Sequence, residues 1–261
     1  VARVAEVFNE LIVERATRED DLRYRATHDP LTGLRNRDGI AEALEAATNG
    51  GAVLYIDLDR FKLVNDSHGH TVGDRVLEIL SARLVRAAGQ GAVVARFGGD
   101  EFLVVLVDEC DHLQVTALAE RLCAELATPI DLDELRLFIR GSVGIARGRP
   151  GVSAEELVRD ADTAMYRAKA SGTGWAVYDD EMGATVRRRL EIESALHGAL
   201  DGHQLEVHYQ PIVRLDTGAV VGAEALLRWE HPVLGRVSPV DFISVAEETG
   251  LIVPIGEWVL R

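Results

Sequence analysis

Apolar residues follow two different periods along this chain, and the two periods alternate. Short runs of β-branched and other apolar residues predict strands, whereas apolar residues that return every three or four positions predict helices. Strands are predicted at 52–58, 92–97, 101–107, 135–145 and 175–178, and helices at about 72–88, 113–127 and 154–170. This alternation is typical of an α/β (α+β) domain in which helices cover a sheet.

The two ends of the chain differ from this central part. A helix is predicted at 1–26 because four apolar residues lie at coiled-coil spacing. They are Val1, Val4, Phe8 and Leu11. The segment is either a frayed helix in front of a domain or a dimerising helix that relays a signal. Pro30 ends this helix, so a domain is predicted over 27–180 and a second unit over 181–261. The elements expected in the second unit are a helix at 187–200, strands at 205–213 and 220–229, and a helix from about 240.

The charge balance limits the choice of partner. The chain has 43 Asp and Glu against 28 Lys and Arg, a formal net charge of −15. Nucleic-acid polymers are held mainly by clustered basic side chains, so no such polymer is expected as a partner. An acidic protein can still bind a nucleotide triphosphate when divalent cations bridge carboxylates and phosphates. No apolar stretch approaches the roughly 18 residues of a membrane span, so the segment is expected to be cytoplasmic and without membrane contact.

The strand at 52–58 delivers two acids near its end. Asp57 and Asp59 are separated by one residue, so alternation places both carboxylates on one face. Mg²⁺ is commonly held by one or two carboxylates together with substrate phosphates. The pair therefore indicates a metal-assisted nucleotide site, although a pair of this kind on its own is as often solvated or capping.

A glycine turn lies between the strands at 92–97 and 101–107. Gly98 and Gly99 can both adopt positive φ, which favours a tight hairpin and leaves room for a ligand close to the backbone. The turn projects Asp100 and Glu101. Two adjacent acids repel each other, and a purely structural hairpin does not explain them.

Four separated motifs together resemble the GGDEF diguanylate cyclases. They are DPLT at 29–32, DLDRFKLVND at 57–66 followed by Gly69-His70 and Gly73-Asp74, RFGGDEF at 96–102, and ADTAMYRAK at 161–169. The resemblance covers about residues 27–180. It implies a ferredoxin-like palm with a mainly antiparallel five-stranded sheet covered by helices. It also implies a homodimer that joins two GTP molecules into cyclic di-GMP with release of pyrophosphate.

The resemblance assigns metal binding and base catalysis to the two acidic motifs. Asp57, the carbonyl of Leu58 and Asp100 would bind Mg²⁺ or Mn²⁺, and Glu101 would share that metal. Asp100 would also act as general base on the attacking 3′-hydroxyl. The division of work between Asp100 and Glu101 stays open.

The resemblance also assigns a set of residues to the substrate. Those expected to contact GTP are Asn65, His70, Asp74, Gly98, Gly99 and Lys169. Asn65 and Asp74 would read the guanine edge. Lys62 and Lys169 are the only lysines of the chain, and both match phosphate positions. Lys62 would stabilise charge on the α-phosphate and Lys169 would hold the outer phosphates.

Two stretches depart from the family pattern. Thr173 stands where many members carry an arginine, so a charge-assisted contact is missing and GTP binding is expected to be roughly ten- to a hundredfold weaker. Residues 89–92 lack the RxxD of the family's product site. Feedback inhibition through that site is therefore expected to be absent.

The second unit resembles the opening of an EAL phosphodiesterase domain. The matching stretches are YQPI at 209–212, EALLRW at 224–229 and PVDFI at 239–243. In that family Glu224 would be a metal ligand, Arg228 would hold a phosphate of cyclic di-GMP, and Gln210 belongs to the same remnant of the site. A barrel of the TIM type typically needs about 250 residues, so only a partial barrel without phosphodiesterase activity is expected.

Three functions follow from these patterns. An active cyclase accounts for the intact RFGGDEF motif and for Lys62. A non-catalytic GTP-binding module that regulates an attached EAL domain is the alternative. A scaffold that only dimerises through 1–26 would leave the carboxylate cluster unexplained.

Overall fold

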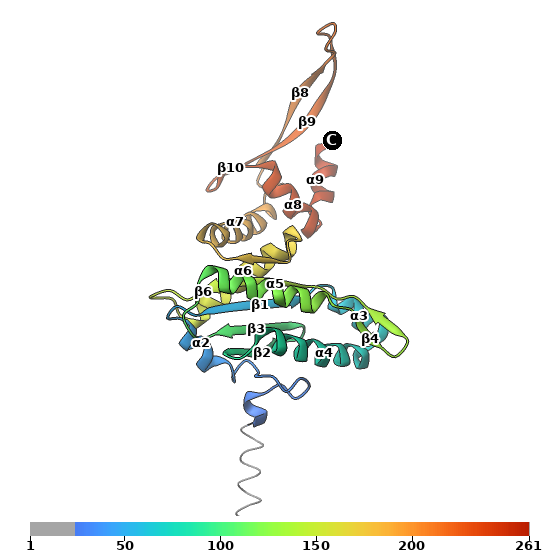
Figure 1. The fold of residues 1–261 in the computed structure, drawn as a ribbon. Helices are drawn as coiled ribbons and strands as arrows, with labels where there is room; N and C mark the ends of the chain where they lie inside the picture. The colour runs from blue at the N-terminus through green and yellow to red at the C-terminus, as the bar shows by residue number, and fades with distance from the viewer. Residues whose placement is uncertain (1–23, 261) are drawn as a thin grey trace, which may run out of the picture. The chain divides into compact units, whose positions relative to one another are not determined.

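The structure is a computed structural model that describes residues 24–260 (Figure 1). The chain divides into two compact units, with the boundary between Met182 and Gly183. The four apolar residues of the predicted coiled-coil seam lie outside the described residues.

A mixed five-stranded sheet forms the centre of the first unit. Its strands are β1 (Ala52–Leu58), β2 (Ala92–Gly98), β3 (Glu101–Leu106), β6 (Gly141–Arg147) and β7 (Trp175–Val177). They lie in the order β2, β3, β1, β6, β7, and every neighbouring pair is antiparallel except β6 and β7. The central strand β1 therefore has a neighbour on each side. Its last residues lie in the middle of the edge that the ends of the strands form.

Helices cover both faces of this sheet (Figure 1). Those on one face are α2 (Ala41–Ala47) and α6 (Ala154–Ser171), and those on the other are α4 (His70–Ala88) and α5 (His112–Ala127). Val53 and Tyr55 of β1 pack in the cluster with α2 and α6, whereas Leu54 and Ile56 pack in the cluster with α4 and α5. Because a strand buried on both faces needs apolar residues at successive positions, β1 is a continuous apolar run.

The strand predicted at 135–145 is wrong in extent. β5 (Leu135–Leu137) pairs with β4 (Ile130–Leu132) in a separate two-stranded hairpin, and β6 joins the main sheet only from Gly141. Phe138 lies between them and is 73% exposed. The apolar run therefore belongs to two strands in two sheets rather than to one buried strand.

The short helices next to the sheet were not predicted either. α2 has only seven residues, and α3 (Phe61–His68) has eight. α3 begins directly after Arg60, whose φ of +58° turns the chain sharply at the end of β1. Elements this short carry too few apolar positions to show a helical period.

The second unit contains a three-stranded sheet and three helices. Its elements are α7 (Asp180–Leu196), which begins ahead of the unit, β8 (Leu205–Val213), β9 (Val220–His231), β10 (Gly235–Val237), α8 (Pro239–Thr249) and α9 (Ile252–Val259). Trp229 and Phe242 meet in its core with ring centroids 5.5 Å apart. The expected partial TIM-type barrel is not formed over residues 183–260. Barrels of that type have parallel strands, whereas β8, β9 and β10 are antiparallel.

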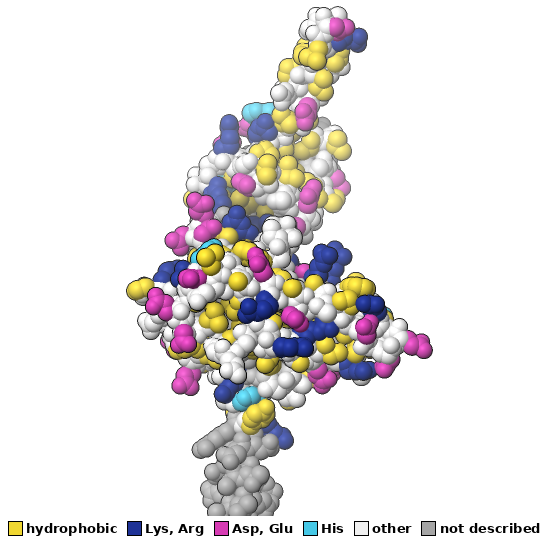
Figure 2. Space-filling model, in the orientation of Figure 1, with side chains coloured by type: hydrophobic (Ala, Val, Ile, Leu, Met, Phe, Trp, Pro, Cys, Tyr) yellow, Lys and Arg dark blue, Asp and Glu magenta, His cyan; other side chains and the backbone are white. Residues whose placement is uncertain are grey.

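The surface carries charges of both signs and scattered apolar side chains (Figure 2). Acidic and basic side chains are interspersed over the visible face of the first unit. The exposed apolar side chains of the β8–β9 hairpin are Tyr209, Ile212, Val213, Leu215, Val220 and Val221. Within residues 24–260, no helix combines the length and the apolar character that a bilayer crossing requires.

Candidate functional site

The end of β1 and the glycine turn lie side by side. Asp57 is the register partner of Glu101 on β3 and of Ser142 on β6. The amide of Leu58 donates a hydrogen bond to the carbonyl of Asp100 over 3.2 Å. The acids of the two motifs, 43 positions apart in the sequence from Asp57 to Asp100, therefore converge at one edge of the sheet.

Asp59 also lies at this edge. Its carboxylate accepts a hydrogen bond from the hydroxyl of Ser142 over 2.9 Å, and its amide donates to the carbonyl of Arg140. Because Ser142 lies opposite Asp57, the prediction that Asp57 and Asp59 share a face agrees with this contact. The hydrogen bonds to β6 fix the direction in which the chain leaves β1.

Arg96 holds the glycine turn in place through hydrogen bonds to its backbone. Its Nε and Nη2 donate to the carbonyl of Gly99 at 3.0 and 2.8 Å, and its Nη1 donates to both carboxylate oxygens of Asp29 at 3.1 and 3.2 Å. Asp29 in turn accepts hydrogen bonds from the amide and the hydroxyl of Thr32. The planar guanidinium thus ties residues 29–32, near the start of the domain, to the turn that carries Asp100.

The Asp29 carboxylate makes the stability of this connection pH-dependent. Burial acts to raise the pKa of Asp29, but the hydrogen bonds from Thr32 and the charge of Arg96 outweigh it and lower the pKa. A lowered pKa in the folded state stabilises the fold above the ordinary value of 3.8, and this stabilisation is lost as the pH falls. We expect the difference in unfolding free energy between the wild type and Asp29→Asn to be largest above about pH 5 and to shrink towards about pH 2.5. Urea unfolding at several pH values across this range measures the difference in unfolding free energy. A difference that stays constant down to the lowest pH would contradict a lowered pKa of Asp29.

The carboxylates at the sheet edge influence one another. Burial raises the pKa of Asp57; Lys169 acts to lower it, and the carboxylates of Asp100 and Asp59 raise it again. Desolvation, followed by the charges of Glu101 and Asp57, also raises the pKa of Asp162 on α6, although that side chain remains exposed. The edge therefore carries an excess of negative charge that favours a bound cation.

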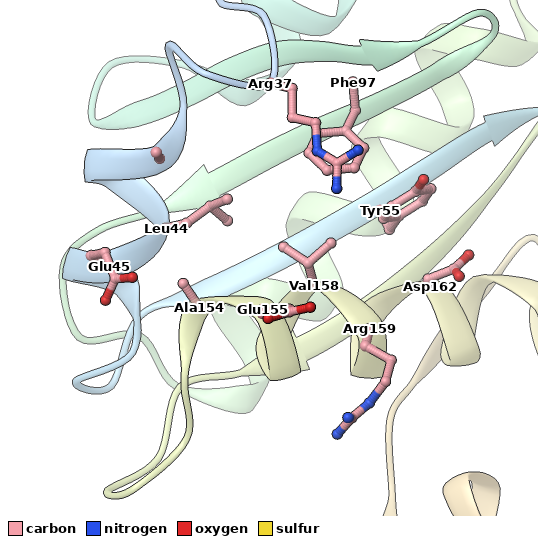
Figure 3. A pocket seen from close by; sticks show the side chains of 11 residues that line it. Arg37, Leu44, Glu45, Tyr55, Phe97, Ala154, Glu155, Val158, Arg159 and Asp162 are labelled. Carbon is pink, nitrogen blue, oxygen red and sulfur yellow. The ribbon is translucent and has the colours of Figure 1, made fainter. Parts of the chain in front are cut away.

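A hollow of about 380 Å³ adjoins this group of acids (Figure 3). Tyr55 and Asp162 line it, together with Phe97, over which the guanidinium of Arg37 lies at 4.9 Å from the ring centroid. Burial raises the pKa of Tyr55, and the charges of Glu101 and Asp162 raise it further. The Tyr55 hydroxyl is therefore held in its neutral form beside the acids.

Lys169 reaches the acids from the last turn of α6. Its Nζ donates to Oδ1 of Asp57 over 2.5 Å. Partial burial disfavours the charged ammonium, but the carboxylates around it, Asp57 foremost, raise the pKa of Lys169. Lys169 and Asp162 are seven residues apart, which places them two turns apart on one face of the helix.

Four residues expected to act on GTP, among them the two expected to bind the guanine, lie on α3 and α4. Lys62 and Asn65 belong to α3, and His70 and Asp74 belong to the first turns of α4. A Cβ added to Gly73 would lie 1.9 Å from Oδ1 of Asn65, so the glycine allows the amide to approach α4 next to Asp74. Asn65 and Asp74 are thus brought near each other. No described contact joins these four side chains to the carboxylates at the sheet edge.

The donor set resembles a shared nucleotide–metal site more than a protein metal cage. Within residues 24–260, no group of three or more His, Cys, Asp or Glu side chains is arranged to hold a metal ion. Asp57, the carbonyl of Leu58 and Asp100 supply two carboxylates and one backbone oxygen. Mg²⁺ usually takes one or two carboxylates and completes its shell with phosphates and water. The residues present fit an ion that arrives with a triphosphate.

The EAL-like residues belong to the second unit. Gln210 and Glu224 are register partners across β8 and β9, and both are exposed. Arg228 donates to the carbonyl of its neighbour Leu227 over 2.9 Å. They share one hairpin but no contact between their side chains is described.

Sequence reasoning gave no role to Asp29, Arg96, Tyr55 or Asp162. The seven-residue spacing between Asp162 and Lys169 was a usable signal, because it predicts a common helix face. The contact of Arg96 with Asp29 spans 67 positions and depends on the order of strands in the sheet, which the chain pattern does not give.

Comparison with known proteins agrees with this geometry. The family model described as "Diguanylate cyclase, GGDEF domain" matches residues 26–174, and that of the EAL domain matches residues 193–261. The chain is 41% identical to the bifunctional diguanylate cyclase/cyclic di-GMP phosphodiesterase MucR of Pseudomonas aeruginosa, over 94% of the chain and 37% of MucR. It is 40% identical to the cyclic di-GMP phosphodiesterase PdeR of Escherichia coli, over 95% of the chain and 38% of PdeR. The chain thus spans about a third of the length of the curated relatives it matches.

A solved structure has the same fold. The coiled coil and GGDEF domain of DgcB from Caulobacter crescentus, in complex with c-di-GMP, superimposes with a TM-score of 0.60 at 29% identity. The superposition covers 68% of this chain and 97% of that one. From the converging acids, the glycine turn and these matches, we conclude that the chain belongs to the GGDEF diguanylate cyclase domain family and continues into part of an EAL domain.

Proposed function

We propose that the GGDEF domain is a diguanylate cyclase that condenses two GTP molecules into cyclic di-GMP. The observation that carries the proposal is the approach of Asp57 to Asp100 and Glu101. In each half of the reaction the 3′-oxygen of one GTP bonds to the α-phosphorus of the other. The bond from that phosphorus to the α,β-bridging oxygen breaks, and pyrophosphate leaves. Two such steps yield one cyclic di-GMP and two pyrophosphates.

The side chains of this chain supply the proton acceptor, the stabilisation of charge and the binding of the nucleotide. The carboxylate of Asp100 or of Glu101 accepts the proton of the attacking 3′-hydroxyl. Lys62 offsets the negative charge that develops on the α-phosphate, and Lys169 binds the outer phosphates. The guanine is bound by Asn65 and Asp74, with His70 at the pocket and with Gly98 and Gly99 allowing the nucleotide close to the backbone.

A divalent cation fits this donor set. Asp57, the carbonyl of Leu58, Asp100 and Glu101 would hold Mg²⁺ or Mn²⁺, since oxygen atoms of carboxylates and of the backbone are the ligands that these ions prefer. When bound, the ion offsets triphosphate charge and lowers the pKa of the attacking hydroxyl. The carboxylates then serve both to bind and to orient the nucleotide.

The architecture supports the proposed domain limits. The order β1, α4, β2, β3, α5, β6 follows the strand–helix–strand–strand–helix–strand pattern of a ferredoxin-like palm. We assign this palm to residues 27–180, a signalling helix to 1–26 and the EAL part to 181–261.

Because each protomer holds one GTP, the reaction requires a homodimer. The test is to incubate the chain at several concentrations with GTP and Mg²⁺ and to quantify cyclic di-GMP and pyrophosphate by chromatography. We expect one cyclic di-GMP per two pyrophosphates, with a specific rate that rises with chain concentration until the dimer is saturated. Unchanged GTP at every concentration would contradict the proposal.

A second candidate is a GTP-binding module without turnover that regulates an attached EAL domain. PdeR, to which the chain is 40% identical, is named as a phosphodiesterase and not as a cyclase, which supports this second candidate. The same incubation separates the two functions, because a regulatory module retains GTP on a filter or in equilibrium dialysis but never converts it.

Thr173 offers a gain-of-affinity test. Its hydroxyl contacts the hydroxyl of Ser171 and the carbonyl of Trp175, so it belongs to an exposed turn just beyond Lys169. Thr173→Arg is expected to lower the KM for GTP by about tenfold, because a charge-assisted contact to phosphate is added. Steady-state kinetics measure this change. Thr173→Met is the control for side-chain size, and an equal KM in both variants would contradict the expectation.

A further inference from the structure

The ammonium of Lys169 lies on a carboxylate that the proposed function gives to the metal ion. Nζ and Oδ1 of Asp57 are 2.5 Å apart, and the residues lie on different elements, α6 and β1. No other side chain of the described residues makes an ion pair with Asp57. In the absence of nucleotide, the charge opposite this carboxylate is therefore supplied by the protein itself.

This ion pair is asymmetric in its surroundings. The Asp57 side chain is 15% exposed and is anchored in the central strand, whereas the Lys169 side chain is 44% exposed. Lys169 lies in the last turn of α6, two residues before the helix ends at Ser171. The ammonium can therefore move into solvent without any rearrangement of the core, while the carboxylate stays in place.

The single positive charge of Lys169 does not neutralise all the carboxylates at this edge of the sheet. Three further acids lie around Asp57: Glu101 is its register partner on β3, the carbonyl of Asp100 accepts a hydrogen bond from the amide of Leu58, and Asp59 is two residues further along the chain. A divalent ion would offset more of this charge than Lys169 does, but it must first replace the ammonium. The same ammonium is a ligand for the outer phosphates of a triphosphate.

We propose that Lys169 occupies the charge position of the divalent ion until a nucleoside triphosphate arrives, so that ion and triphosphate bind together and the ion alone binds weakly. Incoming phosphates draw the ammonium away from Asp57 and leave this carboxylate open to the ion they carry. Binding of the ion and of the triphosphate is then positively coupled, and by linkage each raises the affinity of the other by the same factor. This inference rests on the proposed function of the site as a metal–GTP site.

The test measures Mn²⁺ binding to the full chain without nucleotide, by electron paramagnetic resonance of the free ion. Lys169→Met removes the competing charge and keeps a side chain of similar length. We expect this variant to bind Mn²⁺ about fivefold or more tightly than the wild type, the size that corresponds to one partly screened ion pair. Lys169→Arg keeps the competing charge and is expected to stay within about twofold of the wild type.

Arg167→Met is the matched control. Arg167 lies on the same helix two residues earlier, is exposed, and makes no ion pair among the described residues. Its replacement removes one positive charge near the site without freeing Asp57. Equal tightening of Mn²⁺ binding in Arg167→Met and Lys169→Met would overturn the proposal, because net charge alone would explain it. Unchanged or weaker Mn²⁺ binding in Lys169→Met would overturn it as well.

Two further measurements keep the result interpretable. Circular dichroism melts with and without Mn²⁺ show whether Lys169→Met folds, and Mn²⁺ is expected to raise the melting temperature of this variant more than that of the wild type. A non-hydrolysable GTP analogue is expected to tighten Mn²⁺ binding strongly in the wild type and less in Lys169→Met. Neither readout depends on turnover, so a chain that fails to make cyclic di-GMP can still pass or fail this test on its own.

Discussion

An Asp57→Asn variant is expected to form cyclic di-GMP about a hundred- to a thousandfold more slowly than the wild type. Asn keeps the size of the side chain but removes the charge that, in the proposed site, holds the metal–triphosphate complex at the end of β1. Asp57 is largely buried between β3 and β6, so water cannot easily take over its role. Initial rates from chromatography of the product measure the loss.

Glu120→Gln is the control for this variant. Glu120 is an exposed carboxylate on α5, on the opposite face of the sheet from Lys169. The Glu120→Gln substitution removes one negative charge from the same unit, and the rate of cyclic di-GMP formation is expected to stay within about twofold of the wild type. An Asp57→Asn enzyme that folds normally and keeps more than a tenth of the wild-type rate would contradict the role of this carboxylate.

Gly144→Ala is expected to destabilise the first unit by about 3 kcal/mol or more, and so to lower its melting temperature by roughly 6–12 °C. A Cβ at this position would lie 2.0 Å from the carbonyl oxygen of Ala161 and 2.1 Å from the amide nitrogen of Met165. Both are backbone atoms of α6, so the helix must move away from β6. Because α6 carries Asp162 and Lys169, GTP turnover is expected to fall together with stability.

A second glycine separates this effect from the general effect of Gly→Ala. Gly256 lies inside α9, and a Cβ there would meet no atom within 4 Å. Gly256→Ala is expected to be neutral or slightly stabilising, because alanine favours the helix. Calorimetric melts of both variants provide the comparison. A Gly144→Ala chain that melts like the wild type would show that α6 does not pack on β6 this closely.

The parts of the fold that could be predicted are those whose cause is local. Residues 52–58 form β1 because their apolar side chains fill both faces of the sheet. A hairpin between β2 and β3 is also confirmed, but the turn lies one residue later than the glycine pair predicts: Gly98 pairs with Glu101 at the end of β2, the turn residues are Gly99 and Asp100, and of the two glycines only Gly99 has positive φ. The long helices α4, α5 and α6 follow from their apolar period. The convergence of Asp57 with Asp100 and Glu101 was predicted from the family resemblance, and the register of β1 and β3 places them together.

The parts that could not be predicted depend on contacts across the chain. The apolar pattern of residues 135–145 does not show that the first of them, 135–137, pair with β4 in a separate hairpin. Strand pairing depends on contacts with the rest of the sheet, which the local pattern does not contain. The contact of Lys169 with Asp57 spans 112 positions, and the pattern of α6 alone shows only which helix face Lys169 shares with Asp162. The parallel partner of β6 and the absence of a barrel in the second unit likewise follow from tertiary pairing.

The most direct test is a crystal of the chain grown with Mn²⁺ and a non-hydrolysable GTP analogue, examined by anomalous diffraction at the manganese edge. We expect an anomalous peak at coordination distance, roughly 2.0–2.3 Å, from an oxygen of Asp57 and from the triphosphate, with Asp100 or Glu101 in the same shell and Lys169 moved onto a phosphate. A nucleotide bound with no ion between Asp57 and the glycine turn, or an ion bound elsewhere, would contradict the proposed site.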